Sequence, residues 1–521
     1  MPAPHSRVLL RGGSVHSPAH PAATAMVTVD GTVAWVGDER GAAGQVREVD
    51  DVRDLAGRLV TPGFVDAHVH VGKTGFALQT LDLSTATSLP DALDQLANGC
   101  GDSTGRVVVA HGWDESRWPE DRAFTGSELD RAVGGRVAYA SRVDAHSAVV
   151  TAALVELDPS IATLPGWRGN GAVDRDAHHA ARAVVDSLRS VDERRAALLT
   201  ALRRAASVGL TCVHEVNAPH IAPYDDLDLV DSLRAEHVLP EVVGYWGALQ
   251  GGEHPDAAVA GFAGDLCADG ALGSRTAALN APYADADTSG HLYVDAQHVR
   301  DHVVWCTGRG VQAGFHVIGD RALDAVVAGL RQAAERLGTA RMVAARHRLE
   351  HVEMPSTEGI AVLAALGVVA SVQPAFDAAW GGAEDLYERR LGAERASTMN
   401  PFATMHRAGV LLAFGSDSPV TPMAPWAGVR AAVLHSRSDE RLSLAAAFAA
   451  HTRGGHRARG HDEAGVLSPG ADASYAIWDA SGLPPAPDGG ALPDIAHDGA
   501  LPRCVRTVVS GAVAFDAEDP A

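Results

Sequence analysis

The sequence predicts an α/β fold: a (β/α)8 TIM barrel with a small composite β-sandwich domain formed by both termini. Two patterns predict it. Through the middle of the chain, amphipathic helical stretches alternate with short, almost continuously apolar strands, which is typical of a parallel sheet covered by helices. Both ends read instead as short strands joined by tight turns. With 521 residues, 46% of them hydrophobic, the chain can bury one large core and one smaller core.

The two ends of the chain supply the strands of the predicted β-sandwich. Near the N-terminus we expect strands over 7–11, 25–29 and 32–36, with a hairpin turn at Asp30 and Gly31. Near the C-terminus we expect a strand over 473–478 and a hairpin over 504–515 that turns at Ser510 and Gly511. We therefore predict one domain from residues 1–60 and 464–521, with the barrel over 61–463.

Repeated helix–strand units predict the barrel. Predicted helices end just before strands over 210–216, 311–317, 348–352, 368–373 and 410–416. This many units with near-continuous apolar strands predict a closed barrel of parallel strands. Residues 72–135 are too long for a single connection, so we expect an insertion there that runs over the barrel mouth.

A pair of histidines closes the first strand of the predicted barrel. His68 and His70 end the apolar stretch 60–70, and side chains two apart on a strand point to the same face. Imidazole is the commonest side-chain metal ligand, so both rings are candidate ligands of one ion. Taken alone, such a pair is a weak signal, because many His-x-His pairs bind nothing.

Further polar residues stand at the ends of later strands. His316, His351, Gln373 and Asp417 each end a predicted strand of a separate unit. Because the carboxyl ends of parallel barrel strands converge on one mouth, we expect these side chains to meet the histidine pair there. Any single one could instead be a buried core residue or a helix cap. As a set, four histidines and an aspartate favour a divalent ion, first of all Zn²⁺, with an open position for water.

Such an ion would support hydrolysis. It lowers the pKa of its bound water and so supplies hydroxide near neutral pH. A neighbouring carboxylate can take up that proton and later deliver it to the leaving group, and Asp417 is placed to do so. We therefore predict a metal-dependent hydrolase in which Asp417 is the proton shuttle and His351 lies beside it as a second catalytic residue.

Six ordered motifs resemble the amidohydrolase superfamily, and most of all its YtcJ-like branch, which includes N-substituted formamide deformylases. They are TPGFVDAHVH (61–70), DGALGSRTA (269–277), HVIGDRA (316–322), RHRLEH (346–351), SVQP (371–374) and GSDSP (415–419). The resemblance runs from about residue 7 to residue 515. It implies the same barrel and β-sandwich, and a metal site made of His68, His70, His316, His351 and Asp417.

The same resemblance suggests where the substrate binds. The segments GWDE (112–115) and RVDAH (142–146) match substrate-side motifs of the branch. Our candidates for substrate binding are Trp113, Asp114, Arg142, His146, Arg275 and Gln373. The aromatic and arginine side chains could equally serve barrel packing or an interdomain ion pair.

One position departs from the pattern of the relatives. Many of them carry a lysine shortly before the motif that begins at residue 269, and its carbamate bridges two metal ions. Here that position is Asp265, and the only lysine of the chain, Lys73, lies on another strand's loop. Asp265 is a further candidate ligand, directly or through water, or it is only structural. Glu215 is a second carboxylate that could approach. We expect one well-occupied ion and leave a second ion open.

Composition limits the partners and the compartment. The formal net charge of −22 argues against a nucleic-acid surface, and the sequence has no apolar run of about 18 residues that would predict a membrane span. The N-terminal stretch lacks the apolar core of a signal peptide, and the five cysteines form no CxxC pair. We therefore expect a cytoplasmic protein with a small-molecule substrate, and leave a homodimer open.

Three functions are compatible with these residues. The first is hydrolysis of a C–N bond other than a peptide bond, in an amide, a formamide or a cyclic amide. The second is deamination of an amino-heterocycle at the same metal site. The third is an inactive binding protein on the same fold, which the complete set of five ligands disfavours. The substrate does not follow from the sequence, because loop shapes decide it.

Overall fold

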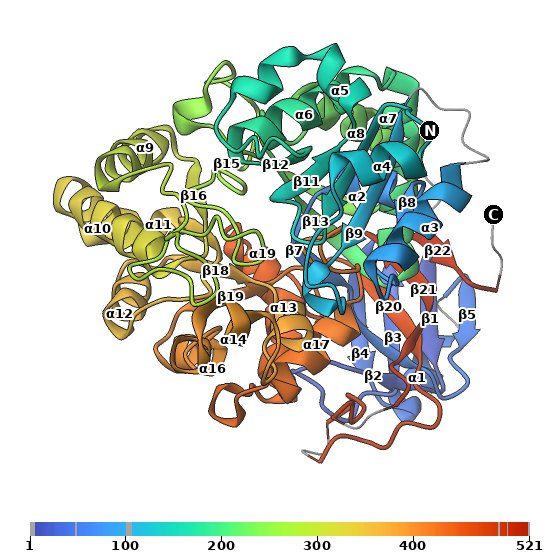
Figure 1. The fold of residues 1–521 in the computed structure, drawn as a ribbon. Helices are drawn as coiled ribbons and strands as arrows, with labels where there is room; N and C mark the ends of the chain where they lie inside the picture. Colours follow the sequence, from blue (N-terminus) through green and yellow to red (C-terminus); the bar gives the residue numbers. More distant parts are fainter. Residues whose placement is uncertain (1–5, 47–48, 101–106, 488–489, 497–498, 519–521) are drawn as a thin grey trace.

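The computed structural model describes residues 6–46, 49–100, 107–487, 490–496 and 499–518. Figure 1 shows a barrel, a layer of strands and helices inserted after its first strand, and a β-domain in which blue N-terminal strands lie beside red C-terminal ones. The predicted α/β class, with a barrel and an additional β-domain from both termini, is confirmed.

Eight parallel strands form the barrel, and they follow one another in chain order. They are β7 (Phe64–Val69), β13 (Leu210–Asn217), β14 (Glu241–Trp246), β15 (Gly261–Phe262), β16 (Gln312–Val317), β17 (Arg348–His351), β18 (Val369–Val372) and β19 (Leu411–Phe414). The barrel closes where Val69 forms a parallel bridge with Ser418, just after β19. The N–H of His70 donates to the carbonyl of Ser418 at 3.0 Å, so closure occurs beside the predicted ligands.

Helices cover the outside of the barrel. The longest, α10 (Asp320–Leu337), buries Leu323, Val326 and Leu330 along one face and ends at Gly338, whose φ of +82° favours glycine. The others are α2 (Val71–Ala77), α7 (Val191–Ser207), α8 (Asp225–Glu236), α9 (Ala296–Arg309), α11 (Thr339–Ala345), α12 (Thr357–Ala365), α13 (Pro374–Trp380), α14 (Leu386–Leu391), α15 (Ala393–Ala396), α16 (Phe402–Arg407), α17 (Pro425–Leu434), α18 (Leu444–Ala450) and α19 (Arg453–Ala458). Among the residues described, no helix has the length and apolar character needed to span a membrane.

The insertion after β7 is longer than the predicted 72–135 and continues through Ser187. It forms its own five-stranded sheet in the order β12-β11-β10-β9-β8. The strands are β8 (Leu81–Asp82), β9 (Val108–Trp113), β10 (Ala138–Arg142), β11 (Ser147–Val150) and β12 (Ala172–Asp174), with helices α3 (Leu89–Cys100), α4 (Gly126–Ala132), α5 (Ala152–Leu157) and α6 (Arg175–Ser187). The prediction stopped short because the strands of this sheet are brief and pair with one another, which no local pattern reveals.

Two sheets build the β-domain. One has the order β4-β3-β1-β5 and the other the order β2-β6-β20-β21-β22, so both termini share the second sheet. The strands are β1 (Arg7–Arg11), β2 (Ser14–Val15), β3 (Ala25–Val29), β4 (Thr32–Gly37), β5 (Asp51–Asp54), β6 (Leu59–Pro62), β20 (Tyr475–Asp479), β21 (Arg503–Val509) and β22 (Ala512–Asp516), and α1 (Glu39–Gln45) follows β4. β6 continues to Pro62, past the predicted boundary at residue 60. Trp478 joins this domain to the barrel, because its ring lies against Gly209 just before β13 and its centroid is 5.6 Å from that of Phe64 on β7.

Candidate metal centre

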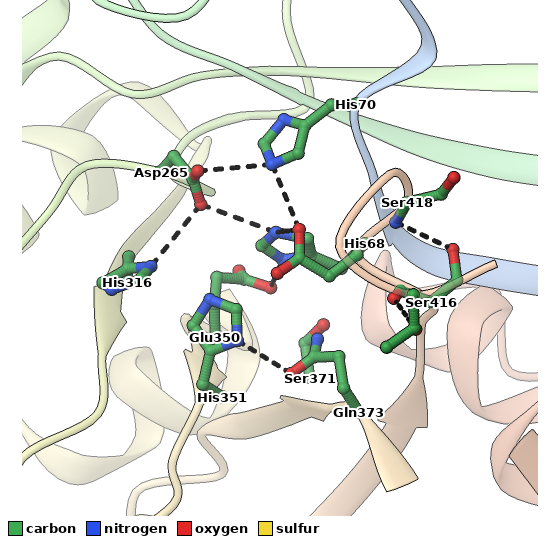
Figure 2. A network of polar contacts seen from close by, with 12 residues as sticks. His68, His70, Asp265, His316, Glu350, His351, Ser371, Gln373, Ser416 and Ser418 are labelled. Carbon is green, nitrogen blue, oxygen red and sulfur yellow. Dashed lines mark hydrogen bonds and ion pairs between the residues drawn. The ribbon is translucent and has the colours of Figure 1, made fainter. Parts of the chain in front are cut away.

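The side chains predicted to bind metal meet at the carboxyl ends of the barrel strands, and Figure 2 shows the rings of His68, His70, His316 and His351 around one space, with the carboxylate of Asp265 among them. The predicted ligands that meet there are His68, His70, His316, His351 and Asp417. Asp66 holds two of the strand ends together, because its carboxylate accepts the N–H of Ser416 at 2.9 Å. The mouth of the barrel therefore holds all five predicted residues.

Two of these residues have a left-handed backbone. The φ angle is +71° at His351 and +53° at Asp417. Residues other than glycine rarely adopt such angles, and where they do the surrounding structure has to stabilise them. Here the angle turns the chain sharply as it leaves β17 and as it enters the loop after β19. Backbone strain of this kind is typical of functional sites.

Two carboxylates approach the first pair of histidines. Asp417 Oδ1 lies 3.4 Å from His68 Nε2 and 3.2 Å from His70 Nε2. Asp265 Oδ1 lies 3.5 Å from the same atom of His68, and its Oδ2 lies 3.3 Å from His70 Nε2. Asp265 Oδ1 also lies 3.8 Å from Nδ1 of His316. The donor atoms of His68, His70 and Asp417, and those of His68, Asp265 and His351, are close enough to share an ion.

Neighbouring acceptors set the tautomers of two histidines. His68 Nδ1 lies 2.9 Å from a carboxylate oxygen of Glu350, and His351 Nδ1 lies 2.8 Å from the amide oxygen Oε1 of Gln373. Both partners only accept, so each Nδ1 carries a proton and each Nε2 is the ring nitrogen that faces the centre. Arg348 balances the charge of Glu350 at 2.6 Å. This is the usual support of metal-binding histidines.

Five buried donor atoms in this space lack a hydrogen-bond partner among the described residues. They are Nε2 of His68, Oδ1 of Asp265, Nδ1 of His316, Nε2 of His351 and Oδ1 of Asp417. A buried polar atom without a partner costs about 1–3 kcal/mol, so five in one place call for a ligand. Three imidazole nitrogens and two carboxylate oxygens suit a divalent ion with nitrogen and oxygen ligands. The residues present therefore fit a metal.

Electrostatics point the same way. Burial raises the pKa of Asp417, but the imidazoles of His68 and His70 outweigh it and hold this pKa well below its usual range. Burial lowers the pKa of His68, whereas Asp417 and Glu350 raise it well above the usual value. Burial, with His316 and His68 beside it, lowers the pKa of His351 to about 3, so this ring is neutral. The ionised Asp417 and the neutral His351 are the forms in which these side chains bind a metal ion.

Asp265 reaches the centre although its side chain is short. From a regular strand an aspartate would not reach as far into the barrel as a lysine, but β15 ends at Phe262 and the chain then turns at Gly264, whose φ is +78°. A Cβ at Gly264 would lie 2.7 Å from Cβ of Val216, so only glycine allows this path. The backbone thus moves Asp265 inward and makes up for the shorter side chain.

Glu215 stays outside the centre. Its carboxylate accepts the N–H of Val71 at the start of α2, and it belongs to neither of the two ligand groups. Burial raises its pKa to about 7. The structure therefore gives Glu215 a supporting role at the helix start.

Comparison with known families agrees with this site. The family described as Amidohydrolase family (Amidohydro_3) matches residues 51–515. The chain belongs to the amidohydrolase family. As a member of this family it is a metal-dependent hydrolase of C–N bonds other than peptide bonds, with a small molecule as substrate.

Relatives of this amidohydrolase confirm the predicted YtcJ-like branch. The chain is 27% identical over 421 residues to the putative amidohydrolase YtcJ of Bacillus subtilis (strain 168), and the match covers 74% of this chain and 75% of that protein. It is 24% identical over 494 residues to the N-substituted formamide deformylase of Arthrobacter pascens, covering 85% and 88%. A crystal structure of an uncharacterized metal-dependent hydrolase from Pyrococcus furiosus shares the fold, with a TM-score of 0.70, 24% identity, and coverage of 90% of this chain and 98% of that one.

A cavity of about 110 Å³ opens beside the metal centre of the amidohydrolase. The barrel lines it with His70, Asp265 and Asp417, and the insertion lines it with residues of β9, β10, the following turn and α6. A second cavity of about 30 Å³ lies against the other side of Asp417 and is lined by Phe376 and Trp380, among others. Both volumes suit a small substrate.

Of the predicted substrate contacts, His146 is the one that lines both cavities, and its ring centroid is 5.0 Å from that of His316. Arg142 borders only the smaller cavity, and its guanidinium is held by Asp114 at 2.9 Å and by Asp144 at 3.0 Å. Asp114 therefore supports the wall rather than forming it. Gln373 orients His351 through the hydrogen bond described above.

The structure places two other predicted contacts away from the cavities. Trp113 packs with Trp118 and Phe124 in the core of the insertion, where its buried indole donates to the carbonyl of Ala140. Arg275 forms a partly exposed ion pair with Asp285 at 2.7 Å. Both follow motifs of the branch, but packing within the insertion and a local ion pair account for them.

Sequence reasoning missed the charged residues of α6 that line the larger cavity. Arg182 and Asp186 face it from this helix, and Arg189 follows in the next turn. A signal was present: His178, Arg182 and Asp186 recur at every fourth residue, which places them on one helix face. The apolar Val185, which is buried, lies on the same face, so the sequence indicates that this face, with its polar side chains, points toward the interior.

Proposed function

We propose that this amidohydrolase hydrolyses a C–N bond in a small amide, formamide or cyclic amide with the help of one divalent ion, first of all Zn²⁺. The ligands would be His68, His70 and Asp417, joined by Asp265 and one or both of His316 and His351. Zinc is favoured because imidazole nitrogens dominate the donor set. The relative from Arthrobacter pascens, named as an N-substituted formamide deformylase, supports the choice of formamides among the candidate substrates.

One observation carries this proposal. Five buried nitrogen and oxygen atoms that could bind a metal have no hydrogen-bond partner in the described chain and lie around one space at the barrel mouth. Two of them are the Nε2 atoms of His68 and His351, whose rings are oriented by a partner at Nδ1. The ion pairs of His68 and His70 with Asp265 and Asp417 are 3.2–3.5 Å long and leave these atoms without a hydrogen bond. A site left open at the mouth of a barrel is typical of catalysis.

Each residue then has a defined task. When bound, a divalent ion supplies Lewis acidity, polarising the carbonyl under attack and lowering the pKa of water. Asp417 is ionised and lies within 3.4 Å of both His68 and His70, so it can accept a proton from water and pass it to the leaving nitrogen. His351, neutral and held by Gln373, keeps its lone pair directed at the centre. We also propose a cytoplasmic location. The net charge of −22 argues against a nucleic-acid partner.

A single ion is expected because no carbamate bridge is available. Lys73 is the only lysine, and its Nζ pairs with both oxygens of Asp186 at 2.8 Å. Removing bicarbonate should therefore leave activity unchanged. Activity measured in degassed, bicarbonate-free buffer checks this, and a loss that bicarbonate restores would contradict it.

Metal analysis and product analysis together test the proposed function. We expect one tightly held divalent ion per chain, mostly zinc, and activity on N-formyl, N-acyl or lactam compounds that a chelator abolishes and zinc restores. The products should be a carboxylic acid and an amine. Ammonia release from an amino-heterocycle, with no activity on amides, would identify a deaminase instead. No bound metal, and activity that chelators do not change, would overturn the proposal.

A further inference from the structure

The larger cavity beside the metal centre is rich in cations. Lys73, Arg182 and Arg189 line it, all on the side that α2 and the insertion provide. Apart from Asp265 and Asp417 at the metal centre, the carboxylates that line it are Asp144 and Asp186. Their pairing decides whether the cavity carries an excess of positive charge.

Asp186 is shared by two cations. Lys73 Nζ lies 2.8 Å from each of its oxygens, and Arg189 NH1 lies 3.1 Å from Oδ1. The guanidinium of Arg189 also lies 3.5 Å above the ring of Phe76. One carboxylate thus balances only one of two positive charges.

Asp144 is occupied elsewhere. Its carboxylate accepts from Arg142 at 3.0 Å and from the hydroxyl of Ser274 at 2.8 Å, and the N–H of His146 donates to it at 3.2 Å. Asp226, which lies behind Lys73, is paired with Arg194. Neither acid is available to the remaining cation.

That cation is Arg182. It donates to two backbone carbonyls, that of Ala145 at 2.6 Å and that of His220 at 3.3 Å. In the described part of the chain, no carboxylate lies within ion-pairing distance of it. Burial and then the charge of Arg182 lower the pKa of the neighbouring His179 to about 4, so this ring adds no charge. The two carbonyls orient the guanidinium but leave its charge unbalanced inside a cavity.

We propose that Arg182 binds a carboxylate of the substrate, so that the substrate is a small amide with an anionic group on the part that occupies the larger cavity. Guanidinium groups are suited to this task, because they bind carboxylates through two parallel hydrogen bonds. That this anion belongs to a substrate rests on the proposed function, whereas binding of the anion does not.

The two cavity volumes indicate which part of the substrate carries the charge. The smaller cavity, about 30 Å³, has room for only about one or two water-sized groups, which suits a formyl or acetyl group. The larger cavity, about 110 Å³, then receives the amine fragment. An N-formyl or N-acetyl amino acid with a small side chain has this shape and charge.

Paired probes that differ only in charge test the assignment. The probes are N-formylalanine and N-acetylalanine, each with its neutral amide. They are tested on the metal-loaded wild type and on Arg182→Met, Arg182→Lys and Arg203→Met. Arg203 is an exposed arginine on α7 and serves as the control for loss of a charge. Turnover is measured for each variant, and binding is measured by calorimetry in an Asp417→Asn background, where the probe is consumed about 100-fold more slowly.

We expect the wild type to prefer the anionic probe. In Arg182→Met, the KM for that probe alone should rise by about 10- to 100-fold, and its calorimetric affinity should fall by the same factor. Arg182→Lys should keep part of the preference, and Arg203→Met should keep all of it. Equal losses of affinity for the anionic and the neutral member of a pair would indicate that Arg182 only holds the cavity wall together through its backbone hydrogen bonds. A preference that survives in Arg182→Met would indicate direct binding of the carboxylate to metal; either result, or no selective binding of any anionic probe, overturns the proposal. Selective binding without turnover would uphold the anion site and count against the proposed function.

Discussion

Asp417 combines two properties at one carboxylate. It lies within 3.4 Å of His68 and of His70, and they keep its pKa low, so it is ionised where a proton has to be accepted. Replacing it with Asn keeps the shape and removes the base. Turnover of Asp417→Asn should therefore fall by about 100-fold or more, while the metal content falls much less. Steady-state kinetics with elemental analysis of the same sample measure both. Near-normal turnover with metal bound would show that another group moves the proton.

Gln373 acts through His351. Because the amide oxygen accepts from Nδ1, it keeps the lone pair of Nε2 directed at the metal. Gln373→Leu should weaken zinc affinity by about 10- to 100-fold, as is usual when such a partner is lost. Competition with a chelator of known affinity measures this.

Gln373→Glu is the matched control, because its carboxylate still accepts from Nδ1. It should keep zinc affinity within a few fold of the wild type. Equal losses in the two variants would mean that the size of the side chain, and not its acceptor, matters.

At the scale of secondary-structure elements, the short strand β15 and the turn after it decide whether Asp265 reaches the metal. Gly264→Ala should disturb this turn, since a Cβ would lie 2.7 Å from that of Val216 and φ is +78°. We expect a loss of stability beyond the roughly 1–2 kcal/mol that a left-handed backbone costs alanine, together with reduced metal content. Thermal unfolding and elemental analysis measure these two effects.

Gly310→Ala, at the end of α9, separates the two causes. Its backbone is left-handed, with φ +70° and ψ 23°, but a Cβ there meets no atom within 4 Å. This variant should lose only the backbone contribution and keep its metal. If both variants lose the same stability and both keep metal, the turn at Gly264 does not position Asp265.

For the whole molecule, the metal links strand ends that lie far apart in the sequence, from β7 to the loop after β19. Removing it leaves two buried carboxylates beside one another, so the apo-protein should be less stable. A free zinc concentration of about 100 times the dissociation constant would contribute about 2.7 kcal/mol. Chelation should lower the melting temperature by a few degrees, and zinc should restore it better than magnesium, which prefers oxygen ligands. A melting temperature that is unchanged by chelation would show that the strand ends need no ion.

The sequence alone determined what depends on local pattern. Helical and strand periodicity, with glycines at helix ends, sufficed for the barrel and for a β-domain built from both termini, because each element reports its own period. His68, His70, His316, His351 and Asp417 were predictable as a group, because a polar residue at the end of an apolar strand is visible in the chain, and parallel strands bring all such ends to one mouth.

Only the tertiary structure decided what depends on distance between segments. The inward turn at Gly264 brings Asp265 to the metal, and the five-stranded sheet of the insertion uses Trp113 as core. Arg275 found a partner in Asp285, whereas Arg182 found none among the carboxylates described. The sequence shows which side chains carry charge, but whether a charge is balanced or left for a substrate depends on which residues the fold places within a few ångströms of it.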